Sequence, residues 1–310
     1  MPRMRVARNR LVREMRTLKG RVRLKINRTR RDIHWEWARL RLGTRNLLLH
    51  NRPISVHVAN IPFLLVPKGA TAEHFWTGLR FERRELEFIL AVLEPGMTFF
   101  DIGANAGLFA LAAAKKMGQG KVYAFEPCQW TYQLLEQNLR LNGVNNVAAV
   151  RTALGDYVGE AVLQLNVAGQ DGLNTLGRPT HPDSQVVGQE KVPITTLDTF
   201  IEAKAIPRVD AMKVDIEGAE LPVFRGAQKL LGRRDAPLIL YEGYGFNTRG
   251  FGYHPVETMW LLEDCGYSLF ALDTATGRVA PRLPGNEYDA MVVGVKPEHP
   301  YYRKVAESGR

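Results

Sequence analysis

The regular alternation of short apolar segments and helix-like segments between residues 97 and 295 constrains the fold more than any other feature. The apolar segments predict strands at 97–102, 122–125, 147–152, 209–214, 237–242, 267–272 and 288–295. The segments between them predict helices at 108–117, 131–142, 218–231 and 255–264. Such alternation is typical of an α/β fold with a mostly parallel sheet and helices on both faces. The last two strands have no helix between them, so the final strand is expected to insert antiparallel.

The segments outside this alternation suggest how the chain is divided. Residues 54–67 predict a β-hairpin, and residues 71–93 predict a helical region that Glu94-Pro95-Gly96 ends. The expected parts are a basic N-terminal arm at 1–52, a hairpin–helix cap at 53–95, an α/β domain at 96–297 and a C-terminal tail at 298–310.

Positive charge is concentrated in the N-terminal arm. Residues 1–52 hold 17 of the 42 Lys and Arg residues against only three of the 32 acidic residues, so the rest of the chain is mildly acidic. Such an arm could contact the phosphates of nucleic acid or an anionic membrane surface. It could equally be an organelle transit peptide or a solvated extension without a partner.

The cysteine count and hydropathy bear on the compartment. Two cysteines, Cys128 and Cys265, cannot build a disulfide framework, which favours a reducing compartment. The N-terminus has no apolar signal region, and no stretch approaches the ~20 apolar residues that span a bilayer. These features predict a cytoplasmic protein, with the arm as a point of peripheral membrane contact.

A glycine-containing loop follows the first strand of the α/β domain. The strand ends at Asp101, and Gly103, Asn105 and Gly107 precede a helix that starts at Leu108. Glycine lets the backbone pass close beneath a ligand, and α/β sheets bind ligands at this edge. The Gly-x-Asn-x-Gly spacing does not suit a dinucleotide, and Asp101 suits a cationic ligand. We expect Asp101, Gly103, Asn105 and Gly107 to bind a cofactor.

Acidic residues also follow the next two strands. Glu126, followed by Pro127, ends the second strand, where a carboxylate can accept both hydroxyls of a ribose. The third strand ends at Leu154, Gly155 and Asp156, where a carboxylate and backbone groups could contact an adenine edge, unless Asp156 only caps a turn. Together these strand ends predict a pocket for a positively charged nucleoside, S-adenosylmethionine.

These motifs resemble those of class I S-adenosylmethionine-dependent methyltransferases, and more narrowly of the FkbM family. The matching segments are DIGANAGLFALAAAK (101–115), VYAFEP (122–127), LLEQNLRLNGVNNV (134–147), TALGD (152–156), VPITTLDTF (192–200) and VDAMKVDIEGAELPVFRGA (209–227). The resemblance covers roughly residues 80–295. It implies a Rossmann-like, seven-stranded class I methyltransferase sheet and methyl transfer to a hydroxyl of a carbohydrate, lipid or secondary metabolite.

The end of the fourth strand supplies the expected catalytic residues. Lys213, Asp215 and Glu217 alternate, so their side chains can project toward one edge of the sheet. We expect Asp215 and Glu217 near the transferred methyl group, with Asp215 also contacting the cofactor. Lys213 is a further catalytic candidate, and the alternative is that it only pairs with these carboxylates. Glu242 and His254 are the candidates for the base. Alternatively, Asp215 and Glu217 only cap the following helix.

Several alternatives stay open at the level of sequence. Asp215, Glu217 and Glu242 could hold a divalent metal such as Mg²⁺ or Ca²⁺, but their spacing does not demand one, and no metal ligand is assigned. An RNA methyltransferase that binds nucleic acid through the arm is the alternative enzyme, and a scaffold without turnover is a third hypothesis. The Asn/Asp-Pro-Pro-Tyr/Phe signature of base methylation is missing, and Cys128 follows the wrong strand for a nucleophile. The loop at 169–175 is expected to form an acceptor-side wall.

Overall fold

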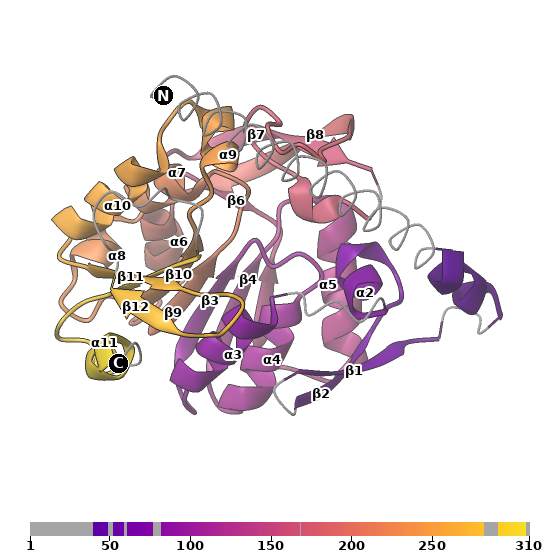
Figure 1. Cartoon of the computed structure of the whole chain (residues 1–310), viewed down its shortest axis with the longest axis horizontal. Coiled ribbons are helices and arrows are strands. Elements are labelled where there is room, and N and C mark those ends of the chain that lie inside the picture. The colour runs from indigo at the N-terminus through magenta and orange to yellow at the C-terminus, as the bar shows by residue number, and fades with distance from the viewer. Residues whose placement is uncertain are drawn as a thin grey trace, which may run out of the picture.

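A sheet of eight strands forms the centre of the molecule (Figure 1). A computed structural model describes residues 40–48, 52–58, 61–76, 82–167, 169–281 and 291–307. The strands of the sheet are β3 (Thr98–Ile102), β4 (Lys121–Phe125), β5 (Val147–Val150), β9 (Ala211–Val214), β10 (Leu238–Glu242), β11 (Ser268–Leu272), β12 (Val279–Pro281) and β13 (Met291–Val295). Their order is β12-β11-β13-β10-β9-β3-β4-β5.

The strand directions confirm the expected class of fold. Strands β5, β4, β3, β9 and β10 are parallel, whereas β13 lies antiparallel between β10 and β11. The α/β class, the mostly parallel sheet and the antiparallel last strand were therefore predicted correctly. The sheet has eight strands rather than seven, because β12 forms in the turn region before β13 and pairs with β11 at the edge.

Helices cover both faces of the sheet because neighbouring strand residues point to opposite faces. On one face, Phe99 and Leu240 share a core with α4 (Leu108–Met117), while on the other Phe100 and Ile239 pack with α10 (Pro255–Asp264). The further helices of the sheet region are α5 (Gln129–Leu141), α6 (Leu197–Ala203), α7 (Glu220–Arg225) and α8 (Gln228–Gly232). The strand ends are thus held between two apolar layers.

The single helix expected at 218–231 is instead the pair α7 and α8. Gly226 separates them and lies so close to the end of β6 (Ala153–Leu154) that a Cβ there would be 2.0 Å from the Gly155 carbonyl oxygen. The Asp198 carboxylate accepts hydrogen bonds from the N–H groups of Lys229 and Leu230, which supports the separate start of α8.

The hairpin expected at 54–67 is present as β1 (Ile54–Val58) and β2 (Ile61–Leu65), and its turn lies outside the described residues. The expected helical region at 71–93 is two helices, α2 (Gly69–Trp76) and α3 (Arg83–Val92), and the residues at 77–81 between them lie outside the described ranges. Side chains of β2 and α3 share the core of α4.

The C-terminal segment forms α11 (Tyr302–Glu307), whose Lys304 ammonium donates to the Ala91 carbonyl at 3.0 Å. The domain boundaries stay predictions.

A smaller sheet stands over the carboxyl ends of the parallel strands. Its strands are β6, β7 (Gly159–Asn166) and β8 (Val186–Thr195), and its order is β6-β8-β7. Figure 1 shows β7 and β8 above β4. Between β7 and β8 lies a loop that contains η1 (Asp171–Leu173), and after β10 come α9 (Gly245–Thr248) and η2 (Arg249–Phe251). These segments surround the edge where the predicted site lies.

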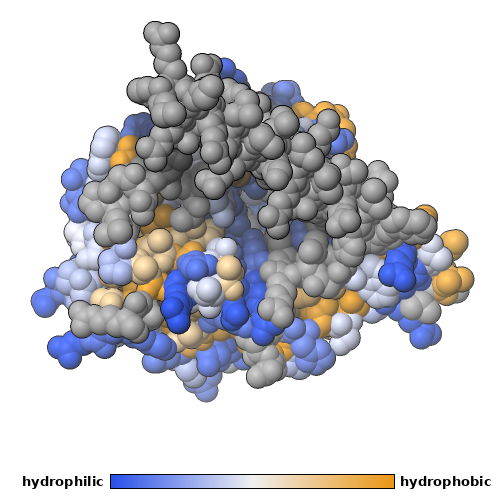
Figure 2. All heavy atoms as spheres, viewed as in Figure 1, coloured by the Kyte–Doolittle hydropathy of each residue, from blue (hydrophilic) through white to orange (hydrophobic). Residues whose placement is uncertain are grey.

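Most of the basic arm expected at 1–52 lies outside the described residues, and residues 40–48 are helical. In Figure 2 this short helix exposes hydrophobic surface at the right-hand end of the molecule, where Leu47 is 80% exposed. Among the helices of the described ranges, none is long and apolar enough to cross a membrane.

Candidate active site

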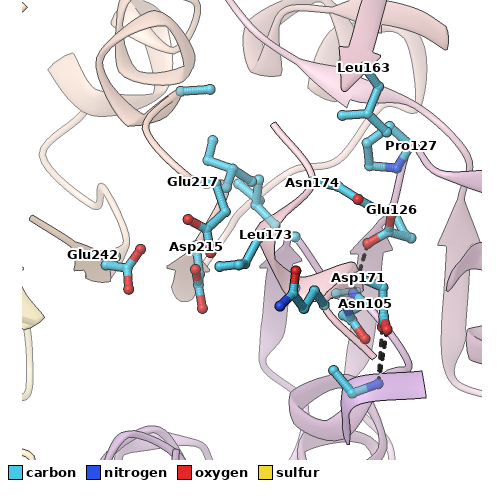
Figure 3. Close-up of a pocket in the computed structure, with 18 of the residues that line it drawn as sticks. Asn105, Glu126, Pro127, Leu163, Asp171, Leu173, Asn174, Asp215, Glu217 and Glu242 are labelled. Carbon is cyan, nitrogen blue, oxygen red and sulfur yellow. Dashed lines mark hydrogen bonds between the residues drawn. The ribbon is translucent and has the colours of Figure 1, made fainter. Parts of the chain in front are cut away.

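A cavity of about 890 Å³ lies at the carboxyl ends of β3, β4, β9 and β10 (Figure 3). Residues of α2 and of the loop between β7 and β8 complete its wall. Ligand pockets of soluble proteins span roughly 300–1,000 Å³, so the cavity has room for a cofactor and part of a second molecule.

The glycine loop forms one side of this cavity. Gly103 has φ +83°, and its N–H donates to the Phe125 carbonyl at 3.0 Å. A Cβ on Gly103 would lie 1.9 Å from the Asp215 carbonyl oxygen, so only glycine lets the end of β3 approach the end of β9 this closely. Asn105 also has positive φ, and its N–H donates to the Glu126 carboxylate at 2.9 Å.

Glu126 is a buried carboxylate in the cavity wall. Besides the bond from Asn105, it accepts hydrogen bonds from the Cys128 N–H at 3.0 Å and the Thr131 hydroxyl at 2.7 Å. Burial raises the pKa of Glu126 to about 7, although these three hydrogen bonds favour the ionised form. Figure 3 shows its carboxylate beside Asn105 at the cavity, held in one orientation.

Asp101 and Gly107 do not line the cavity, contrary to expectation. Asp101 is fully buried beneath the loop, where one oxygen accepts from the Ala110 N–H at 2.9 Å and the other has no hydrogen-bond partner among the described residues. Burial raises the pKa of Asp101 to about 6, and attraction by Lys213 opposes this rise. Gly107, with φ +90°, lies at the start of α4 against Leu135. Asp101 and Gly107 therefore support the glycine loop through packing and a backbone hydrogen bond, and neither lines the cavity.

The four remaining residues expected to bind the cofactor, Pro127, Leu154, Gly155 and Asp156, divide into two groups. Pro127 and Leu154 line the cavity. Gly155 instead packs against Ile194, where a Cβ would lie 2.7 Å from the Ile194 side chain. Asp156 is exposed and lies outside the cavity wall, because the chain turns away after the two-residue strand β6. The prediction for Gly155 and Asp156 is corrected accordingly.

Lys213 is a buried cation at the end of β9. Its Nζ lies 2.9 Å from Asp215 Oδ2, 3.8 Å from Glu82 Oε1 and 4.4 Å from the centre of the Phe109 ring. Burial alone would lower the pKa of Lys213, but Asp215, Glu82 and Asp101 raise it above its ordinary value. Burial alone would raise the pKa of Asp215, and Lys213 holds it below its ordinary value instead. Lys213 and Asp215 are therefore an ionised pair, and a catalytic role for Lys213 stays a prediction.

Glu217 and Glu242 lie beside Asp215 in the cavity wall (Figure 3). Carboxylate oxygens of the three residues lie within 4.8 Å of one another. Burial, and then repulsion by Asp215, raise the pKa of both Glu217 and Glu242 well above the ordinary value. The Asn247 amide donates to Glu242 at 3.1 Å. Acidic groups often gather without an ion, and we assign no metal to this trio.

His254 is excluded as the base by its position. His254 is exposed at the start of α10. Its ring accepts a hydrogen bond from the Val256 N–H at 3.3 Å, and its backbone N–H donates to the Glu257 carboxylate at 2.9 Å. This capping box orients the helix, and His254 lies outside the cavity wall. Of the expected catalytic residues, Lys213, Asp215, Glu217 and Glu242 come together and His254 does not.

The structure adds Glu82, which sequence reasoning missed. It lies just before α3 with φ +47° and lines the cavity. Burial raises the pKa of Glu82 to about 8, and a hydrogen bond joins it to Asp215. The pattern of apolar residues in 71–93 does not mark Glu82 as a residue of the site. Its contact with Lys213 forms only when the folded chain brings these two distant segments together.

The loop expected as an acceptor-side wall does line the cavity. Residues 169–174 contribute to the wall, and Figure 3 shows Leu173 and Asn174 between Glu217 and Glu126. Buried Asp171 accepts hydrogen bonds from the Ala70 N–H at 3.0 Å and the Gly169 N–H at 3.2 Å. Asp171 therefore joins this loop to the start of α2 on the opposite side.

The chain is similar to methyltransferases in sequence. The family model described as "Methyltransferase FkbM domain" matches residues 101–269, more than half of the chain. Methyltransferase sdnD of Sordaria araneosa is 30% identical over 166 residues, which cover 45% of this chain and 64% of that protein. Hexuronic acid methyltransferase AglP of Haloferax volcanii is 26% identical over 163 residues, covering 52% of this chain and 63% of that protein.

A third relative is 31-O-demethyl-FK506 methyltransferase FkbM of Streptomyces tacrolimicus. It is 27% identical over 197 residues, which cover 53% of this chain and 75% of that protein. The alignments with sdnD and AglP thus span less than two thirds of those proteins. The family match begins at the glycine loop and includes β4, β9 and β10, which carry the cavity. The chain belongs to the FkbM methyltransferase family.

Proposed function

We propose that the protein is an S-adenosylmethionine-dependent methyltransferase that methylates a hydroxyl group of a glycan, lipid or secondary metabolite. The observation that carries this proposal is one cavity with Glu126 on one side and the Asp215, Glu217 and Glu242 carboxylates on the other. The names of two relatives, which mention a hexuronic acid and 31-O-demethyl-FK506, support a hydroxylated acceptor. We do not propose RNA as the acceptor. The only feature that favoured RNA is the basic charge of residues 1–52, and most of these residues lie outside the described ranges.

The residues in the wall fit the parts of this cofactor. The Glu126 carboxylate keeps one free acceptor site for a ribose hydroxyl, since a carboxylate offers about four acceptor sites and three are used. Leu154 and Leu163 offer apolar contact for adenine. In the same wall, Gln170 Oε1 is buried without a partner among the described residues and can accept a further hydrogen bond.

The cofactor, when bound, supplies a methyl group on a positively charged sulfur. The ionised Asp215 lies where its charge favours that cation, and Lys213 keeps it ionised. The Glu217–Glu242 pair takes the proton from the acceptor hydroxyl, because burial and repulsion by Asp215 make these carboxylates stronger bases than an exposed glutamate. Residues 169–174 form the wall of the cavity on the side where the acceptor is expected.

Titration with S-adenosylmethionine and with its demethylated product tests the cofactor assignment. We expect micromolar binding by the wild type and a dissociation constant raised about ten- to a hundredfold in Glu126→Gln, because a charged hydrogen bond to the ribose is lost. Glu136→Gln on the outer side of α5 is the matched control. Unchanged affinity in a folded Glu126→Gln variant would contradict the ribose contact, and parallel titrations with Mg²⁺ and with EDTA report any metal effect.

Transfer of labelled methyl groups to a panel of hexuronic acids, hydroxylated macrolides and RNA tests the acceptor class. Turnover of the hydroxylated compounds and none of RNA is the expected result.

The pH dependence of turnover tests the base. Because a base must be ionised to accept a proton, kcat is expected to fall as the pH is lowered through the raised pKa of the Glu217–Glu242 pair, well above the ordinary 4.5. Glu217→Gln and Glu242→Gln should each lower kcat by about a hundredfold or more. The exposed Glu160→Gln variant is the control. If kcat falls only near the ordinary glutamate pKa, or if both variants keep full activity, this role is contradicted.

A further inference from the structure

The segment that joins β9 to α7 has an unusual backbone. It carries Asp215 and Glu217, and Glu217 has φ +53° although it is not glycine. Residues with a side chain rarely adopt this left-handed conformation, and they persist there only where surrounding contacts hold them. The next residue, Gly218, has φ +102°. The direction of the Glu217 side chain therefore depends on what holds these two peptides.

Two hydroxyl groups from distant parts of the chain hold consecutive carbonyls of this segment. The Thr175 hydroxyl donates to the Glu217 carbonyl at 3.0 Å, and the Tyr253 hydroxyl donates to the Gly218 carbonyl at 2.7 Å. Thr175 lies 42 residues before its partner and Tyr253 lies 35 residues after its own. Thus the loop after β7 and the segment before α10 each donate one hydrogen bond, to the carbonyls of the neighbouring residues Glu217 and Gly218.

Each hydroxyl is itself oriented by a backbone donor. The Gly177 N–H donates to the Thr175 oxygen at 3.1 Å, and the Leu221 N–H donates to the Tyr253 oxygen at 3.3 Å. A hydroxyl that accepts in this way turns its single proton toward its acceptor, here a carbonyl of the segment. The Thr175 bond therefore has a defined direction. The Tyr253 proton has a second acceptor, the Glu220 carboxyl at 3.3 Å, but the Gly218 carbonyl at 2.7 Å is the nearer one.

The other side of the segment is closed by backbone and by a carboxyl group. A Cβ on Gly218 would lie 2.5 Å from the Asn247 carbonyl oxygen, so the segment presses directly on α9. The Gly218 N–H donates to the Glu220 carboxyl at 3.2 Å. The segment cannot shift toward α9, and the hydroxyl bonds of Thr175 and Tyr253 hold the Glu217 and Gly218 carbonyls while the Glu220 carboxyl holds the Gly218 N–H.

We propose that Thr175 and Tyr253 are positioning residues that hold the Glu217 carboxylate against Glu242 in the cavity. Both lie outside the cavity wall, so they act through the backbone of Glu217 and Gly218 rather than by touching the acceptor. Thr175 directly follows the wall residues 169–174, which links the acceptor-side loop to the base through one hydrogen bond. This inference rests on the proposed function, in which Glu217 and Glu242 take the proton.

The test compares Thr175→Val, Thr175→Ser and Tyr253→Phe in the full chain. Valine and phenylalanine keep the shape and remove the hydroxyl, whereas serine keeps it. The two hydroxyl-deleting variants are expected to lower kcat about ten- to a hundredfold, as displacement by about an ångström does, with KM and the dissociation constant of S-adenosylhomocysteine unchanged. Thr175→Ser should restore most of the turnover. Tyr267→Phe, which removes a buried hydroxyl bonded to the Pro237 carbonyl at 3.0 Å far from the site, is the matched control.

Amide hydrogen exchange supplies a second measurement that does not depend on turnover. Peptides covering 215–221 are expected to exchange faster in Thr175→Val and Tyr253→Phe, while peptides of β3 exchange as in the wild type. Wild-type exchange at 215–221 in both variants overturns the inference, and so does an equal loss of kcat in Tyr267→Phe. If the wild-type protein methylates no acceptor, the proposed function fails, and the exchange experiment still decides whether the hydroxyls hold the segment.

Discussion

Replacing Lys213 with methionine is expected to lower the free energy of unfolding by about 3–5 kcal/mol at pH 7. The Lys213 side chain is only 3% exposed, and its ammonium lies 2.9 Å from Asp215. Methionine has a similar length but no charge, so the carboxylates of Asp215, Glu82 and Asp101 would lose the cation that they share. Removing one partner of a buried pair is costly because the other charge stays buried without compensation.

The size of this loss should depend on pH. In the wild type the folded-state pKa of Asp215 lies below its ordinary value, so the ion pair stabilises the fold above that ordinary value and the contribution disappears as the pH falls through the folded-state value. Without the lysine, burial raises the pKa of this carboxyl instead, and it binds a proton on acidification. The destabilisation by Lys213→Met is therefore expected to shrink between pH 7 and about pH 4.

Denaturant unfolding of the variant and the wild type at several pH values measures this effect. Lys116→Met is the matched control, because Lys116 is an exposed lysine of α4 and its loss should change stability by less than about 0.5 kcal/mol. A Lys213→Met variant as stable as this control at pH 7 would show that the buried carboxylates need no cation.

Replacing Gly103 with alanine is expected to remove most cofactor binding and to lower stability. The new Cβ would lie 1.9 Å from the Asp215 carbonyl oxygen, whereas real Cβ atoms stay beyond 3.0 Å, and φ at this position is +83°. A backbone atom cannot rotate away, so the ends of β3 and β9 must separate by about 1 Å. Such a displacement at a binding site costs about a hundredfold in function, and the strain should lower the free energy of unfolding by about 2–4 kcal/mol.

Titration with S-adenosylhomocysteine and denaturant unfolding check both parts of this prediction. Gly143→Ala is the matched control, since Gly143, just after α5, also has positive φ, +62°, but a Cβ there meets no atom within 4 Å. It carries only the backbone cost of about 1–2 kcal/mol and leaves the cavity intact. Wild-type affinity in Gly103→Ala would mean that the close approach of the two strands does not shape the cofactor site.

Local sequence patterns predicted most of the sheet and one side of the cavity. Helix α4 was predicted with its observed bounds, Leu108–Met117, because two glycines precede it and an apolar run continues through it. Glu126 and Asp215 were predicted to line one pocket because both follow parallel strands, whose carboxyl ends lie at one edge of a sheet. That inference requires only that the strands are parallel, and it does not depend on their order in the sheet.

The same local reasoning failed where a residue's surroundings come from distant segments. Asp156 follows a strand as Glu126 does, but β6 joins the smaller sheet, so the chain turns away from the cavity. His254 has the chemistry of a base, but it caps α10. The break between α7 and α8 depends on the approach of Gly226 to the Gly155 carbonyl.

Residue order along the chain is therefore enough to predict the α/β class, the glycine loop and the carboxylates at the ends of the parallel strands, because periodicity and strand direction are local properties. The contact of Glu82 with Lys213, and the hydrogen bonds from Thr175 and Tyr253 to the carbonyls of Glu217 and Gly218, could be found only in the folded structure. Burial and hydrogen bonding between segments tens of residues apart depend on the complete path of the backbone. Those two properties set the charge and the direction of the side chains in the cavity.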